Sequence, residues 1–149
     1  TDIQAAIGLS QFKSLNGFIK NKNYNRKKII RSLISDKRWK NQVEFVENDK
    51  SITPSWFGLT MLINPKFKNN KKKIINKLDK LGIENRPIIG GNFLKQPALK
   101  KYNLKQKSNN FPNANYVHEF GLFVGLKNNP LSSLETKRFI NIFFKAFEI

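Results

Sequence analysis

The sequence predicts an α+β fold: a short, mainly antiparallel sheet with helices on one side. Apolar runs and two-residue alternation typical of strands lie between segments whose apolar residues recur at helical spacing. The predicted order is helix, helix, strand, strand, helix, strand, short helices, strand, helix. Helices that are segregated from a small sheet are typical of α+β proteins rather than doubly wound ones.

The chain begins with two predicted helices. Thr1 suits the N-cap of the first helix, whose apolar residues point nearly all round the helix. A helix that is apolar on most sides needs cover on most sides, so we expect a preceding domain or a second subunit to cover it. Because the sequence opens inside this helix without a methionine, we expect a fragment of a longer chain. A second, amphipathic helix is predicted over residues 18–34.

Strands and helices then follow in turn. Strands are predicted at 43–46 and 56–63, and a helix at 70–81 with Gly82 as its left-handed C′ residue. The remaining predicted elements are a strand at 83–89, a helical turn at 96–102, a helix at 113–119 and a strand at 120–124. Ser132 and Glu135 have capping-box spacing before a last helix with an apolar face.

Composition restricts the function classes. The 149 residues carry 28 Lys and Arg against 10 Asp and Glu, a formal net charge of +18. Lysine dominates the cations and its clusters lie apart, so we predict a basic, solvated surface with neither nucleic acid nor membrane as partner. A stand-alone basic module that binds nucleic acid is the alternative. The apolar runs are too short to span a bilayer, and the absence of Cys fits a reducing cytoplasm.

The sequence holds few groups for catalysis. The only histidine, His118, has no Cys or second His with which to form a metal site, and we interpret it as a helix-surface or interface residue. Neither a nucleophile-elbow motif nor a phosphate-binding glycine loop is present. We therefore predict that this chain provides contacts and no complete active site.

The stretch from Arg86 to Pro97 is the most unusual part of the sequence. An arginine heads a strand, two glycines end it, and polar side chains follow in a turn, which would gather groups that bind anions and hydroxyls. An ordinary strand-to-turn connection with solvated polar residues explains the stretch equally well. The candidate substrate-binding residues are Arg86, Gly91, Asn92, Lys95 and Gln96.

Four blocks of the sequence carry a family resemblance. Residues 1–12 (TDIQAAIGLSQF) resemble a helix of the DegT-type sugar aminotransferase family, pyridoxal-phosphate enzymes of the aspartate aminotransferase fold (fold type I). Residues 54–58, 86–97 and 111–125 agree with the family in order and spacing. The 86–97 pattern is most similar to a branch of that family, the nucleotide-diphospho-4-keto-6-deoxyhexose 3-dehydratases of lipopolysaccharide sugar biosynthesis.

The resemblance implies that the chain is the C-terminal third of such an enzyme. Residues 1–35 would form interface and interdomain helices, and residues 36–149 the small C-terminal domain. The large upstream domain would bind most of the cofactor, pyridoxal or pyridoxamine 5'-phosphate, and carry the Lys or His that faces it. No catalytic residue is then expected in this chain. The implied partners are a nucleotide-diphosphate 4-keto-6-deoxy sugar and a second copy in a homodimer, in the cytoplasm.

The implied activity of the full protein is a 3-dehydratase acting in deoxysugar biosynthesis. The Gly-Gly-Asn turn favours this activity over that of an aminotransferase acting on the same class of sugar, which is the alternative. The choice depends on the upstream Lys or His, and both GDP and CDP sugars remain open. Trp56 and Phe57 would be core aromatics, with a pocket-lining role as the alternative.

Overall fold

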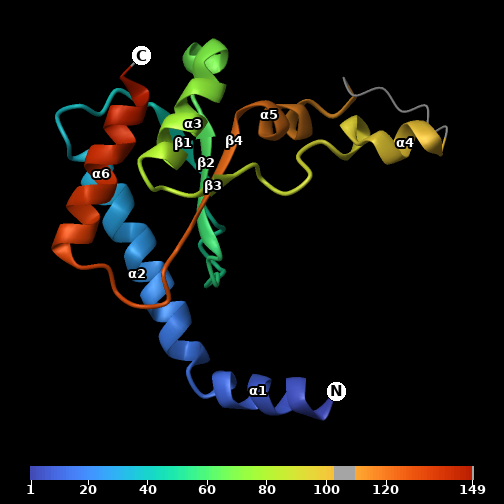
Figure 1. The fold of residues 1–149 in the computed structure, drawn as a ribbon, viewed down its shortest axis with the longest axis vertical. Helices are drawn as coiled ribbons and strands as arrows, with labels where there is room; N and C mark the ends of the chain where they lie inside the picture. The colour runs from blue at the N-terminus through green and yellow to red at the C-terminus, as the bar shows by residue number, and fades with distance from the viewer. Residues whose placement is uncertain (103–109, 149) are drawn as a thin grey trace.

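The computed structural model describes residues 1–102 and 110–148, and within them it contains one four-stranded sheet. The strands are β1 (Val43–Phe45), β2 (Gly58–Ile63), β3 (Asn85–Arg86) and β4 (Gly121–Gly125). Their order across the sheet is β1-β2-β4-β3, and every neighbouring pair is antiparallel. The predicted α+β class with a short antiparallel sheet is therefore confirmed (Figure 1).

The central strand β2 has one fully buried face. Met61 lies opposite Phe45 of β1 and Leu122 of β4, and Leu59 lies opposite Val124. Since side chains alternate along a strand, the odd positions of β2 all point into the core, while Thr60 and Leu62 are only half-buried. This alternation fixes the register of the sheet, because a slip of one residue would expose the apolar set.

Three helices close the core over this face of the sheet. They are α2 (Leu15–Ile34), α3 (Lys71–Lys80) and α6 (Ser133–Phe147), and α6 packs against both of the others (Figure 1). Phe143 of α6 is fully buried and meets Phe144 edge-on, with 5.4 Å between ring centroids. The helical side chains of the core cluster are Ile29, Leu33, Ile74, Leu78, Ile140, Phe143, Phe144, Ala146 and Phe147.

Helix α1 (Asp2–Phe12) has no buried residue and extends away from the rest of the chain (Figure 1). Thr1 and Gln4 form a capping box at its start, as the sequence predicts for the N-cap. Ile3 and Phe12 are 76% and 70% exposed. The described part of the chain therefore provides none of the cover that this apolar helix needs. Among the described residues, none of the helices combines the length and apolar character required to cross a membrane.

Helix α2 begins earlier than predicted. It starts at Leu15 rather than at residue 18, because the carbonyl of Ser14 already accepts the N–H of Phe18 at 3.0 Å. Gly17 does not interrupt the helix, since a glycine lowers helix stability without preventing its hydrogen bonds.

The predicted strand at 83–89 is wrong except at its centre. Only Asn85 and Arg86 pair with β4. Pro87 has no N–H with which to continue the ladder, and Ile89 has a φ of 42° and is almost fully exposed. The edge strand consequently ends after two residues and the chain turns away from the sheet.

The other predicted elements lie within three residues of their observed positions. A 3₁₀ helix, η1 (Pro65–Asn70), comes directly before α3, and Gly82 follows α3 with a φ of 91°. After β3 come η2 (Phe93–Lys95), α4 (Pro97–Lys101) and α5 (Pro112–Phe120). The capping box of α6 is also confirmed, because Ser132 Oγ accepts the N–H of Glu135 at 3.1 Å. The Lys127 ammonium that binds Glu135 lowers the pKa of this carboxyl to about 2.

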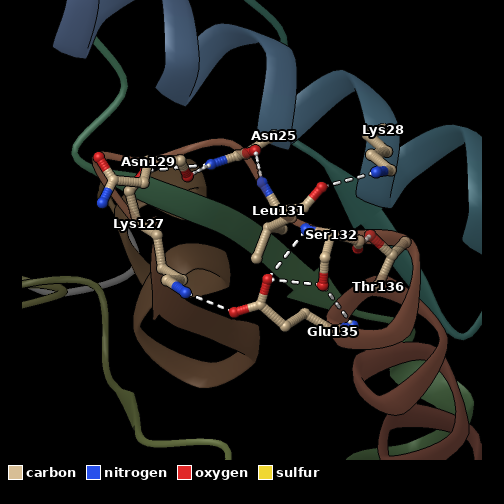
Figure 2. Close-up of polar contacts among 8 residues, drawn as sticks. All are labelled: Asn25, Lys28, Lys127, Asn129, Leu131, Ser132, Glu135 and Thr136. Atoms are coloured by element: carbon tan, nitrogen blue, oxygen red, sulfur yellow. Dashed lines mark hydrogen bonds and ion pairs between the residues drawn. The ribbon is translucent and has the colours of Figure 1, made fainter.

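Asn25 joins α2 to the loop between β4 and α6 (Figure 2). Its side chain is fully buried, and its amide donates to the carbonyls of Lys127 and Asn129 at 3.1 and 2.8 Å. Its Oδ1 accepts the N–H of Leu131 at 2.8 Å. Lys28, one turn later, donates to the Leu131 carbonyl at 2.7 Å. These bonds pair the loop's backbone groups with side chains of α2 and hold the start of α6 against α2.

Substitution of this asparagine should destabilise the fold. Asn25→Ala leaves an amide N–H and two carbonyls without partners, so we expect a loss of about 3 kcal/mol in the free energy of unfolding. Urea unfolding measures this loss. Asn21→Ala is the matched control, because Asn21 is on the same helix but makes one exposed bond, to the carbonyl of Asn128 at 2.9 Å. Equal losses in the two variants would contradict the role of Asn25.

Candidate functional site

The turn between Gly90 and Gln96 is closed by its own hydrogen bonds. The N–H of Gly91 donates to the Ile88 carbonyl at 2.9 Å, and Gly91 has a φ of 58°. Asn92 Oδ1 accepts the N–H of Leu94 at 2.9 Å and so caps η2. The side chain of Gln96 donates back to the Gly90 carbonyl at 2.7 Å. The structure therefore brings together four of the five candidate residues: Gly91, Asn92, Lys95 and Gln96.

This turn packs against α5. Asn92 is buried, its side-chain amide donates to Asn115 Oδ1 at 2.8 Å, and its backbone N–H donates to His118 Nδ1 at 3.2 Å. A Cβ atom on Gly91 would lie 2.5 Å from the same Nδ1. His118 is half-buried and accepts at Nδ1, so the neutral ring carries its proton on Nε2. The only histidine of the chain is thus a partner of the turn, a role that the sequence analysis missed.

Three ammonium groups surround the C-terminal end of α5. Lys68 and Lys95 lie 3.0 and 3.6 Å from the carboxylate of Glu119. Lys71 donates to the Glu119 carbonyl at 2.5 Å, where a cation also compensates the negative end of the helix dipole. The hydrogen bond from Lys68 is the main cause of the lowered pKa of Glu119, and burial lowers the pKa of Lys71. This side of the turn is therefore positively charged, with three ammonium groups around one carboxylate.

Sequence reasoning selected Lys95 but not Lys68 or Lys71. Both belong to a lysine-rich segment in which no local pattern distinguishes one lysine from the next. Only the packing of η1 and α3 against α5 shows which of these ammonium groups reach the turn.

Arg86 lies apart from these four residues. Its guanidinium is exposed and donates to Glu84 Oε1 at 2.7 Å. The arginine lines a groove of about 470 Å³ that runs between β4 and α6 and is also lined by Phe123, Lys127 and Arg138. The five candidate residues therefore face two neighbouring surfaces rather than one.

The two aromatic candidates, Trp56 and Phe57, also lie in different environments. Phe57 is 77% exposed, lines the groove beside Arg86 and stacks on Phe123 with ring centroids 5.6 Å apart. The prediction of a core position is wrong for Phe57. The strand β2 begins at Gly58, the residue after Phe57, so Phe57 lies outside the strand at the open end of the sheet. Trp56 is half-buried, and the guanidinium of Arg26 lies 4.2 Å from its ring centroid.

The small antiparallel sheet, its three covering helices and the turn on α5 define a small domain of the aspartate aminotransferase fold. The model of the DegT/DnrJ/EryC1/StrS aminotransferase family matches residues 1–137, and the chain belongs to this family.

Similar proteins include nucleotide-sugar enzymes. The chain is 32% identical over 145 residues to a GDP-4-keto-6-deoxy-D-mannose 3-dehydratase of Yersinia pseudotuberculosis, covering 97% of this chain and 35% of that protein. The Escherichia coli GDP-4-keto-6-deoxy-D-mannose-3-dehydratase with bound hydrated PLP superposes with a TM-score of 0.75 at 29% identity, over 96% of this chain and 34% of that one. A variant of a GDP-4-keto-6-deoxymannose-3-dehydratase with bound GDP-perosamine superposes equally well, with a TM-score of 0.75 at 30% identity, over 93% and 34%. The chain thus spans about a third of the length of these relatives.

The contact between Gly91 and His118 leads to a test of the turn. Gly91→Ala combines a positive φ with a Cβ atom placed 2.5 Å from the ring, so residues 90–96 should lose their hydrogen bonds to α5. We expect at least tenfold faster amide hydrogen exchange across the turn. Gly90→Ala is the control, since the nearest atom to its Cβ would be 3.6 Å away. Unchanged exchange in Gly91→Ala would show that the contact does not order the turn.

Proposed function

We propose that the full protein is a nucleotide-diphosphate 4-keto-6-deoxyhexose 3-dehydratase that uses pyridoxal or pyridoxamine phosphate and acts in deoxysugar biosynthesis for lipopolysaccharide. The observation that carries this proposal is the identity to the Yersinia dehydratase, which extends over nearly the whole chain. In this proposal the chain contributes contacts to the nucleotide sugar and part of a dimer interface.

The cofactor is held mainly outside residues 1–149. The residues of the turn are bonded to one another and to α5, and His118 Nδ1 occupies the space into which a Cβ atom on Gly91 would point. Lys71, the half-buried lysine beside the turn, is engaged with the end of α5 and is not available to face a cofactor aldehyde. When bound, the cofactor supplies the amine and the electron sink for loss of the 3-hydroxyl. The groups of this chain bind and orient the sugar.

Lys95 is the proposed contact to the diphosphate, and Arg86, which faces the neighbouring groove, is the proposed contact to a hydroxyl of the nucleotide sugar. Both are cations whose partners are surface carboxylates, and such exposed pairs are weak enough for a ligand to replace. Gln96 and Gly91 present the backbone and amide of the turn to the sugar hydroxyls. Asn92 is buried against Asn115, which supports a positioning role for its side chain. GDP is the proposed nucleotide, since a related dehydratase binds GDP-perosamine.

The exposed apolar surface of α1 supports the proposed homodimer. A helix with this much apolar surface is stable in water only when another body covers it. We propose that the large domain and the second subunit share this cover. In the proposed division, residues 1–35 connect the domains and 36–149 form the small domain, although Ile29 and Leu33 of α2 also enter its core. We place the enzyme in the cytoplasm.

An activity assay tests the proposal directly. The full-length protein with pyridoxamine phosphate should replace the 3-hydroxyl of GDP-4-keto-6-deoxymannose by hydrogen, while the pyridoxamine phosphate is oxidised to pyridoxal phosphate and its nitrogen is released as ammonia. Mass spectrometry of the sugar product detects the loss of one oxygen. The same mixture with glutamate as amine donor tests the aminotransferase alternative. Formation of a 4-amino sugar with the 3-hydroxyl retained would reject the dehydratase.

The proposed contacts lead to a second kinetic prediction. Arg86→Gln and Lys95→Gln should each raise the KM for the nucleotide sugar about tenfold with a smaller change in kcat, because each removes one charge-assisted hydrogen bond to the ground state and transition state alike. Lys73→Gln on the exposed side of α3 is the control for the loss of one positive charge. Unchanged kinetics in both site variants would reject these contacts.

A further inference from the structure

A second basic cavity lies between α2 and the segment that precedes β2. It has a volume of about 420 Å³ and is lined by three cations of α2, Arg26, Lys27 and Arg31, and by Glu47, Thr53 and Trp56. None of the candidate residues between 86 and 96 lines it. The cavity is therefore separate from the turn on α5 and from the groove beside Arg86.

Arg26 is the most unusual residue of this cavity. Only 5% of it is exposed, and its guanidinium donates to the Val46 carbonyl at 2.5 Å and to both carboxylate oxygens of Glu47 at 3.1 and 3.4 Å. It also stacks on Trp56. Its Nε is buried and has no hydrogen-bond partner among the described residues. This atom is enclosed by the protein, so Arg26 shapes the wall of the cavity, while the exposed side chains of Lys27 and Arg31 are the cations that a ligand can reach.

The charge of the cavity indicates which ligand it fits. Three cations and one carboxylate leave a formal charge of +2, and the side chain of Glu47 is 66% exposed, so its charge is largely solvated. Arginine side chains match phosphate oxygens in geometry as well as in charge. The hydroxyl of Thr53 offers a neutral donor in the same lining. A dianionic phosphate group would neutralise the cavity.

We propose that this cavity is a binding site for the phosphate group of a small molecule, separate from the proposed nucleotide-sugar contacts. The ligand is either inorganic phosphate or a nucleoside diphosphate, since the two share the group that the cations recognise. The site goes beyond the proposed dehydratase function and does not depend on it.

Calorimetric titration of the full-length protein tests this proposal with two probes, inorganic phosphate and GDP. Arg26 itself anchors α2 to the chain before β2, so the test uses the exposed pair in the double variant Lys27→Gln/Arg31→Gln. Glutamine keeps the helix propensity of the residues it replaces. Lys72→Gln/Lys80→Gln on α3 is the matched control, because it removes the same charge from exposed positions that do not line the cavity.

The wild type and the control should bind phosphate with equal affinity, and the cavity variant at least tenfold more weakly. A GDP site that binds more tightly than phosphate and is lost only in the cavity variant identifies the nucleotide as ligand. If only the binding of phosphate is weakened in the cavity variant, the ligand is inorganic phosphate. Either result supports the site. The proposal fails if the wild type binds neither probe, or if the cavity variant and the control bind them equally.

Discussion

The burial of one face of β2 is the constraint on which the rest of the structure depends. Leu59, Met61 and Ile63 are completely buried, and this fixes how β1 and β4 pair with β2. The pairing of Gly121 with Leu62 then fixes the start of β4 directly after α5. Helix α5 in turn presents His118 to the turn at Gly91. The position of the candidate site is thus set by a core that contains none of its residues.

Much of the fold is predictable because it follows local rules. The helical spacing of apolar residues predicts α3 and α6, and the signals at Gly82 and Ser132 predict where helices end and begin. The strand predicted at 83–89 is too long for an equally local reason. Pro87 ends the hydrogen-bonded ladder, whatever the β propensity of the isoleucines that follow. The β propensity indicates which side chains are favourable in a sheet. The backbone N–H groups determine how far the strand can continue its hydrogen bonds.

The candidate site is less predictable because its contacts join residues distant in sequence. Asn92 and His118 are 26 residues apart, and no periodicity connects them. The same holds for charge, since a lysine-rich composition conceals Lys68 and Lys71 among cations that have no partner role in the turn. Arg26 shows the opposite case, in which a residue from an ordinary amphipathic helix becomes distinctive only through its burial and its stacking on Trp56.

The two long N-terminal helices belong to different packing environments, and this difference matters for function. Helix α2 contributes Ile29 and Leu33 to the core, and Asn25 ties it to the loop before α6, so it moves with the small domain. Helix α1 shares none of that packing, although only Lys13 and Ser14 separate the two. A body that covers the apolar surface of α1 would therefore lie next to α2, which packs into the core of the small domain. In the proposed homodimer, a partner surface at α1 would help to set where the turn at Gly91 lies.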